Sequence, residues 1–205
     1  MTTFVPCSQQ HLRGWRSQFA CPRGWLGEIA GWLLAVKNRG RSLAVLDRLH
    51  VWHDARVLEI GFGPGVDLRR VAERVARGTL AGVDASEVML AQASRRNRRA
   101  IDEGRMDLRL GSMTALPFGE EFDAVYSINT LPFARDWSAA FNEMSRVLKP
   151  GGQLLIAVQP RSKNVTAEAM RDRIAAAMTD AGFCSIEAVL IDMRPAPVAC
   201  VSALR

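Results

Sequence analysis

The stretch Arg56–Arg70, "RVLEIGFGPGVDLRR", joins a short apolar run to three glycines and then to a helical pattern. The apolar run predicts a buried strand that ends at Gly61, and the residue spacing from Val66 onward predicts a helix. Glycines at 61, 63 and 65 allow a tight turn and let a ligand touch bare backbone. The free N–H groups that open the helix point into the same space. The stretch therefore predicts a ligand-binding crevice at the end of a strand.

Strands and helices alternate along the rest of the chain, which is typical of a parallel sheet covered on both faces. The last two strands have no helix between them, and this predicts an antiparallel hairpin at the sheet edge. The sequence thus predicts an α/β fold, a Rossmann-like seven-stranded mostly parallel sheet with an antiparallel C-terminal hairpin and an N-terminal helical cap. We expect strands at 56–60, 79–84, 106–110, 122–128, 152–158, 184–192 and 198–204, and helices at 66–77, 86–102, 136–148 and 166–181. Pro150-Gly151-Gly152 predicts a break between a helix and the strand that follows it.

Residues 1–54 differ from the rest of the chain, and we interpret them as a helical cap or lid over a binding domain at 55–205. Four of the five tryptophans precede the first strand. Residues 1–56 hold eight Lys and Arg against three Asp and Glu, so they carry +5 of the total charge of +6. Three hypotheses stay open for this segment: a lid that encloses an apolar ligand, a dimer interface, and a surface that contacts a membrane.

The glycine spacing argues against a dinucleotide. Dinucleotide-binding loops read G-x-G-x-x-G, whereas Val66 stands where that pattern needs its last glycine. Pro64 lacks the N–H that a pyrophosphate would accept, and Glu59 adds negative charge there. Asp84 ends the second strand, where a carboxylate commonly accepts hydrogen bonds from ribose hydroxyls. The pattern favours a nucleoside with a positive charge and no phosphate.

Five segments in order resemble the motif series of class I S-adenosylmethionine-dependent methyltransferases, namely "VLEIGFGPG", "GVDASEVMLAQA", "GSMTALPF", "FDAVYSINTL" and "EMSRVLKPGG". The resemblance covers roughly residues 55–160 and is strongest to a small-molecule branch that includes the quinone-biosynthesis C-methyltransferases. It implies S-adenosyl-L-methionine as cofactor, S-adenosyl-L-homocysteine as product, and no metal.

The resemblance also implies roles for the residues near the glycines. Glu59 and the backbone at Gly61, Gly63 and Gly65 would hold the methionine end of the cofactor. Asp84 would bind the ribose.

Further along, the same resemblance implies that Ala85 and Met89 flank the adenine. Ser112 and Met113 stand where the family usually has Asp followed by a small or apolar residue, and Ser112 would bond the adenine amino group more weakly than Asp. Asn129 would face the methionine portion of the cofactor or the incoming nucleophile.

The sequence offers no compelling general base, so the catalytic residues are unknown. Methyl transfer from a sulfonium needs alignment in a dry pocket and needs a base only when the nucleophile arrives protonated. His11, Glu28 and Asp136 are weak candidates. His50 and His53 are three residues apart, and we interpret them as surface turn residues, not as metal ligands.

The acceptor is expected to be a small, apolar or aromatic molecule, such as a secondary metabolite or a quinone-like or lipidic compound. Amine methyltransferases of bases place Pro-Pro-aromatic after strand four, which Asn129-Thr-Leu-Pro-Phe133 lacks. The basic run 95–99 ends a predicted helix, where arginines suit the helix dipole, so we do not expect nucleic acid. Three alternatives remain: a regulatory protein that binds the cofactor without catalysis, a membrane-surface lipid methyltransferase, and a nicotinamide-dependent oxidoreductase.

The sequence also bears on where the protein is located and how it assembles. No secretory signal pattern is visible, and the longest apolar run, residues 29–36, is far shorter than the ~20 residues of a membrane span. The four cysteines form no C-x-x-C pair, and we expect free thiols in a cytoplasmic protein. The chain is expected to be a monomer or a homodimer.

Overall fold

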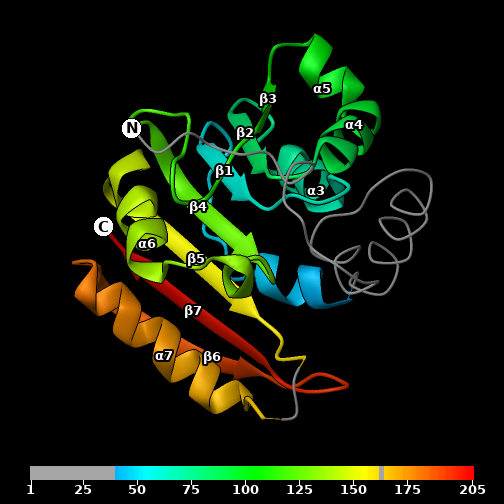
Figure 1. The fold of residues 1–205 in the computed structure, drawn as a ribbon. Helices are drawn as coiled ribbons and strands as arrows, with labels where there is room; N and C mark the ends of the chain where they lie inside the picture. The colour runs from blue at the N-terminus through cyan, green and yellow to red at the C-terminus, as the bar shows by residue number, and fades with distance from the viewer. Residues whose placement is uncertain (1–39, 162–163) are drawn as a thin grey trace.

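A seven-stranded sheet in the order β3-β2-β1-β4-β5-β7-β6 forms the centre of the computed structural model, which describes residues 40–161 and 164–205 (Figure 1). The four pairs from β3 to β5 are parallel, and β7 pairs antiparallel with both β5 and β6. The strands are β1 Arg56–Ile60, β2 Thr79–Asp84, β3 Met106–Leu110, β4 Phe122–Ile128, β5 Leu148–Val158, β6 Cys184–Ile191 and β7 Val198–Leu204. The predicted fold class and the C-terminal hairpin are confirmed. Most of the predicted cap lies outside the described residues.

Helices cover both faces of this sheet. One apolar cluster joins the strands to α6 and α7, and a second joins their other face to α3, α4 and residues 45–49. The helices are α3 Val66–Arg74, α4 Glu87–Arg96, α5 Arg98–Asp102, α6 Trp137–Val147 and α7 Ala167–Asp180, with a 3-10 turn η2 Leu131–Phe133 and a helical segment at 40–46. Within the described ranges, no helix is long and apolar enough to cross a membrane. Cys184 and Cys200 are free thiols.

Two sequence predictions need correction. The predicted helix at 86–102 is broken at Asn97, because the Asn97 side chain donates hydrogen bonds to the carbonyls of Gly65 (3.0 Å) and Ala93 (2.9 Å) and ends α4 there. The predicted break at 150–152 lies inside β5. That strand already pairs at Leu148, and the extra residues form an irregularity in its register with β4.

The glycine loop between β1 and α3 is tightly packed at its ends and open in its middle. Gly61, Gly63 and Gly65 all have positive φ, at 77°, 51° and 74°. A Cβ on Gly61 would lie 2.0 Å from the Thr130 hydroxyl, and one on Gly65 would lie 2.7 Å from the Cβ of Ala93 in α4. A Cβ on Gly63 would meet nothing within 4 Å. The first and third glycines therefore let neighbouring elements approach, and the second faces open space.

This difference predicts unequal effects of two matched substitutions. Gly65→Ala combines left-handed strain with a clash against α4, and we expect it to lower the free energy of unfolding by about 2–4 kcal/mol. Gly63→Ala adds only the strain, at about 1–2 kcal/mol. Urea denaturation of both variants checks this, and equal losses would show that the α4 contact does not constrain Gly65.

Candidate cofactor site

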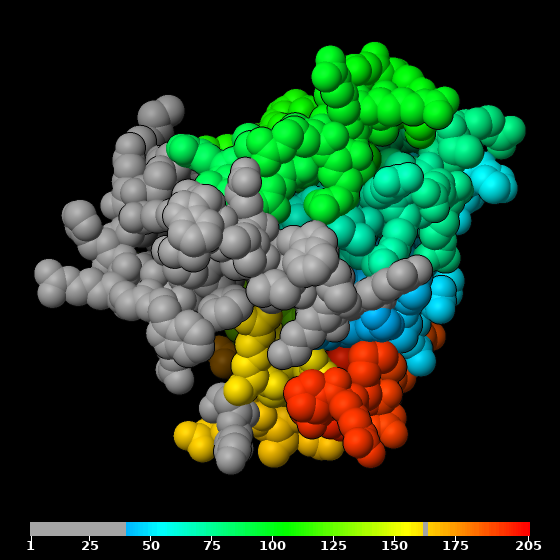
Figure 2. Space-filling view, turned by 90° about the vertical axis from the view of Figure 1, so that its right-hand side faces the viewer, coloured from blue at the N-terminus to red at the C-terminus, as the bar shows by residue number. Residues whose placement is uncertain are grey.

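The glycine loop lies at the carboxyl ends of the parallel strands, where β1 is flanked by β2 and β4. The chain leaves β1 toward β2 and returns on the other side at β4, and ligands of open α/β sheets bind at such a reversal of strand order. Figure 2 turns this side of the molecule toward the viewer, with α4 and its neighbours above in green and the β6–β7 loop below in orange-red. The predicted residues Asp84 and Asn129 stand at the ends of β2 and β4, beside the loop.

Asp84 is joined directly to the glycine loop. Its carboxylate accepts a hydrogen bond from the Gly63 N–H at 2.9 Å and another from the Ser86 N–H at 2.9 Å. Burial raises the pKa of Asp84, and these N–H donors oppose that rise. Each carboxylate oxygen retains acceptor capacity beyond one such bond, so the group suits a pair of hydroxyl donors. Ser86 caps α4 by accepting from the Met89 N–H.

Glu59 lies beneath the loop and is buried. The Tyr126 hydroxyl donates to its carboxylate at 2.7 Å. Burial and the negative charge of Asp67 raise the pKa of Glu59 well above its ordinary value, and the Tyr126 hydrogen bond opposes that rise. Sequence reasoning assigned Glu59 to the cofactor's ammonium, which stays a prediction. The structure adds a second role, because Glu59 satisfies the buried hydroxyl of the chain's one tyrosine.

Asp67 begins a polar cluster that links α3 to the 40–46 segment. Its carboxylate accepts from the Ser42 hydroxyl at 2.7 Å and forms an ion pair with Arg70 at 2.6 Å. The Arg74 guanidinium in the same helix donates to the Leu46 carbonyl. The Asp67 contacts fix the start of α3, next to the glycine loop, and the Arg74 contact fixes its end.

Asn129 has a left-handed backbone, with φ of 60°. Its N–H donates to the Ala157 carbonyl at 2.7 Å, and its side-chain oxygen accepts from the Gln159 N–H at 2.8 Å. Gln159 in turn donates to the Ala196 carbonyl in the β6–β7 loop at 2.5 Å. Asn129 therefore ties the ends of β4 and β5 together, and its predicted contact with the cofactor or the nucleophile stays untested.

The four residues expected around the adenine lie after β2 and β3. Ala85 is exposed, and Met89 is buried in the cluster on the α3–α4 face. Ser112 bonds the Thr114 hydroxyl at 2.9 Å and accepts from the Thr114 N–H at 3.2 Å, so its hydroxyl shapes a local turn. Met113 packs partly buried against the other apolar cluster. The contacts of these four residues with adenine therefore stay predictions.

The weak candidates for a general base have other positions. Asp136 caps α6 by accepting from the Ala139 N–H at 2.9 Å. This structural role accounts for an aspartate at position 136 without a role in catalysis. His11 and Glu28 lie outside the described residues. No group of three or more metal-ligating side chains occurs in the part of the chain that the structure describes.

Two features of the site were missed from the sequence. Phe62, between the first two glycines, is buried against Gly82 of β2, where a Cβ would lie 2.7 Å from its ring. A glycine inside a strand is a signal of such close approach. The sequence also did not predict the role of Asn97, because no local pattern indicates a hydrogen bond to the Gly65 carbonyl, 32 residues away.

The loop and its surroundings fit a nucleoside with a cationic amino-acid tail. Gly63 presents backbone to open space, and Asp84 stands beside it with acceptor oxygens for hydroxyl groups. Pro64 offers no N–H to a phosphate, and its carbonyl accepts from Arg96. These residues would hold S-adenosylmethionine better than a dinucleotide.

The raised pKa of Glu59 predicts a specific pH dependence of stability. Because the folded state binds this proton more tightly than the unfolded chain, the stability that Glu59 contributes is complete below its ordinary pKa. That contribution is lost as pH rises through the higher folded-state pKa. Glu59→Gln removes this titration. We expect wild type to lose stability relative to the variant with rising pH, by up to about 1.4 kcal/mol per pH unit in that window.

Urea denaturation from about pH 4 to about pH 9 measures the difference. Glu73→Gln is the matched control, because the Glu73 side chain is 72% exposed on α3. A Glu59→Gln difference that does not change with pH would contradict the assignment.

Comparisons with known proteins agree with this geometry. A methyltransferase-domain family model matches residues 57–152. An uncharacterized methyltransferase, YdaC of Bacillus subtilis (strain 168), is 30% identical over 179 residues, covering 85% of this chain and 97% of that protein. Cycloartenol-C-24-methyltransferase 1 of Oryza sativa subsp. japonica is 31% identical over 139 residues, covering 67% of this chain and 39% of that protein.

A solved structure shares the fold at low identity. Haemonchus contortus phosphoethanolamine N-methyltransferase 2, in complex with S-adenosyl-L-methionine, superposes with a TM-score of 0.74 at 17% identity, covering 95% of this chain and 60% of that one. The matched family model spans the glycine loop, Asp84 and Asn129 together. This chain belongs to the class I S-adenosylmethionine-dependent methyltransferases.

Proposed function

We propose that this methyltransferase acts on a small acceptor that is apolar or aromatic. The observation that carries the proposal is Phe133, a residue that is 51% exposed in η2, the turn that follows β4 after two residues. This turn follows Asn129 at the cofactor side of the sheet, and Leu131 anchors it in the core. An exposed aromatic ring beside a binding crevice offers an apolar contact for a ligand.

The cofactor would supply an electrophilic methyl group on a cationic sulfur. This chain's own residues would bind and orient it, with Asp84 accepting from the ribose and the backbone at Gly61, Gly63 and Gly65 lying against the methionine end. An apolar wall at η2 would exclude water from the line of attack, and alignment in a dry pocket supplies much of the rate enhancement. Asp136 is engaged as a helix cap, so the base that a protonated acceptor such as a hydroquinone needs is not assigned among the described residues.

The substrates named for similar proteins vary and do not by themselves select an acceptor class. The rice relative is named for a sterol, which is largely apolar, and the nematode structure for phosphoethanolamine, which is polar. A quinone-like or lipidic acceptor fits the exposed ring at η2 better than a charged amine does. Ser112 in place of the usual Asp would weaken the hold on adenine and lower cofactor affinity.

An acceptor panel tests the proposal with the full-length protein and methyl-labelled S-adenosylmethionine. We expect label transfer to a hydroquinone or a sterol and none to phosphoethanolamine. Phe133→Ala should raise KM for the apolar acceptor about tenfold or more, given the roughly 1.5–3 kcal/mol associated with burying such a ring. Leu204→Ala is the matched control, because Leu204 is exposed but pairs with Gln153 near the opposite end of the sheet.

Other outcomes would redirect the proposal. Transfer to phosphoethanolamine alone would overturn the apolar acceptor. Activity that appears only with lipid vesicles would favour a membrane-surface lipid methyltransferase. Cofactor binding with no transfer to any acceptor would favour a regulatory role.

A further inference from the structure

β3 is an edge strand. It pairs with β2 in parallel register, from Leu80 opposite Met106 to Asp84 opposite Leu110. No strand in the described ranges pairs with its other side. An edge of this kind presents a row of N–H and C=O groups that another strand can bind.

The hydrogen bonds at the two ends of β3 show which backbone groups face outward. The Arg105 carbonyl accepts from the Leu80 N–H, and the Gly111 N–H donates to the Asp84 carbonyl, both at 2.9 Å. Residues of a strand direct their N–H and C=O alternately to its two sides. The odd-numbered residues therefore bond β2, and the even-numbered ones, Met106, Leu108 and Leu110, turn their backbone groups to the free edge.

The sequence of β3, "MDLRL", is self-complementary about Leu108. An apolar residue lies at its centre and at each end, with an acid on one side of the centre and a base on the other. If a second copy pairs antiparallel with Leu108 opposite Leu108, Asp107 of each copy lies opposite Arg109 of the other. Directly opposed unlike charges stabilise a strand pair, and like charges destabilise it.

We propose that two copies of this chain associate through their β3 edges, antiparallel about a two-fold axis at Leu108, to form one continuous sheet. The outward N–H and C=O groups of Met106, Leu108 and Leu110 then bond those of the second copy. Asp107 and Arg109 fall in the non-hydrogen-bonded pairs, where opposed side chains lie closest. The proposal concerns assembly and does not depend on the acceptor.

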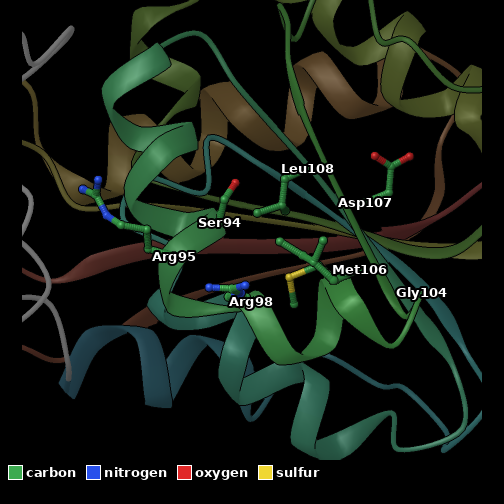
Figure 3. Close-up of a pocket in the computed structure, with 8 residues that line it drawn as sticks. Ser94, Arg95, Arg98, Gly104, Met106, Asp107 and Leu108 are labelled. Atoms are coloured by element: carbon green, nitrogen blue, oxygen red, sulfur yellow. The ribbon is translucent and has the colours of Figure 1, made fainter.

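The helix-covered face of β3 has room for side chains of the second copy. A cavity of about 630 Å³ between β3 and the helices α4 and α5 is lined by Ile101, Met106 and Leu108, with Ser94 and Arg98 at its polar side (Figure 3). Figure 3 shows Met106 and Leu108 on the helix side of the strand and Asp107 directed away from them. Opposed residues of paired strands point to the same face, so the second copy's apolar side chains would lie beside this cavity.

The charged pair is already positioned for this contact. Arg109 donates to Asp107 through two guanidinium nitrogens, at 2.9 and 2.6 Å, and to the Pro117 carbonyl at 2.5 Å. Its guanidinium also lies 4.4 Å from the centre of the Phe118 ring. A side chain held this way loses little conformational freedom on association. Pairing would join the two copies' ion pairs into one network of four charges.

The other edge of the sheet lacks this complementarity. β6 carries one charged residue, Glu187, and no base within Cys184–Ile191. A second copy pairing there would find no unlike charge. β3 is therefore the edge whose sequence suits its own copy.

Analytical ultracentrifugation of the full chain from about 1 to about 100 μM tests the proposal. Wild type should approach twice its mass of 22.6 kDa as concentration rises. Asp107→Lys and Arg109→Glu each place like charges opposite one another twice, and each should weaken self-association about tenfold or more. A mixture of the two single variants restores both unlike pairs and should form a heterodimer, as the double variant should form a homodimer. Glu187→Lys on β6 is the matched control and should associate like wild type.

Three results would contradict a dimer formed through β3. A wild type that stays monomeric across the series overturns the proposal. A dimer that survives both single variants places the interface elsewhere. Failure of the mixture to associate rejects the two-fold register, provided thermal unfolding shows both variants folded.

Discussion

The left-handed backbone at Gly61, Gly63 and Gly65 is the constraint on which the site depends. It lets Thr130 approach from the end of β4 and α4 approach from the other side, and it leaves Gly63 facing open space. The bond from the Gly63 N–H to Asp84 then fixes the loop against β2. A side chain at the outer glycines would separate the very elements whose ends form the crevice, so fold and binding site share one requirement.

Beneath the glycine loop, the buried polar side chains are hydrogen-bonded or ion-paired to one another. Glu59 accepts from Tyr126, and Asp67 joins Ser42 and Arg70 at the start of α3. Buried polar groups cost stability unless they are hydrogen-bonded, so this arrangement specifies how α3 and the 40–46 segment sit on the sheet. The glycine loop therefore lies above hydrogen-bonded polar groups on the face of the sheet that α3 covers.

The sequence predicted the local order well, because each strand is a short apolar run bounded by turn residues. The strands at 56–60, 79–84, 106–110, 122–128 and 198–204 begin and end where predicted. What it could not supply were long-range contacts, such as Asn97 to Gly65, which breaks a helix whose periodicity continues through it. The cofactor residues were named from motif positions, and their side-chain partners within the protein, Tyr126 above all, could not be deduced from spacing.

The most direct test of the cofactor site is calorimetric titration with S-adenosylmethionine, S-adenosylhomocysteine and NAD. We expect both sulfur nucleosides to bind wild type and NAD not to bind. We expect Asp84→Ala to weaken their binding about tenfold or more, through the loss of hydrogen bonds to a charged group. Asp102→Ala, an exposed carboxylate on α5, should bind like wild type. Binding of NAD alone, or unchanged affinity in Asp84→Ala, would contradict the assignment of the glycine loop and Asp84.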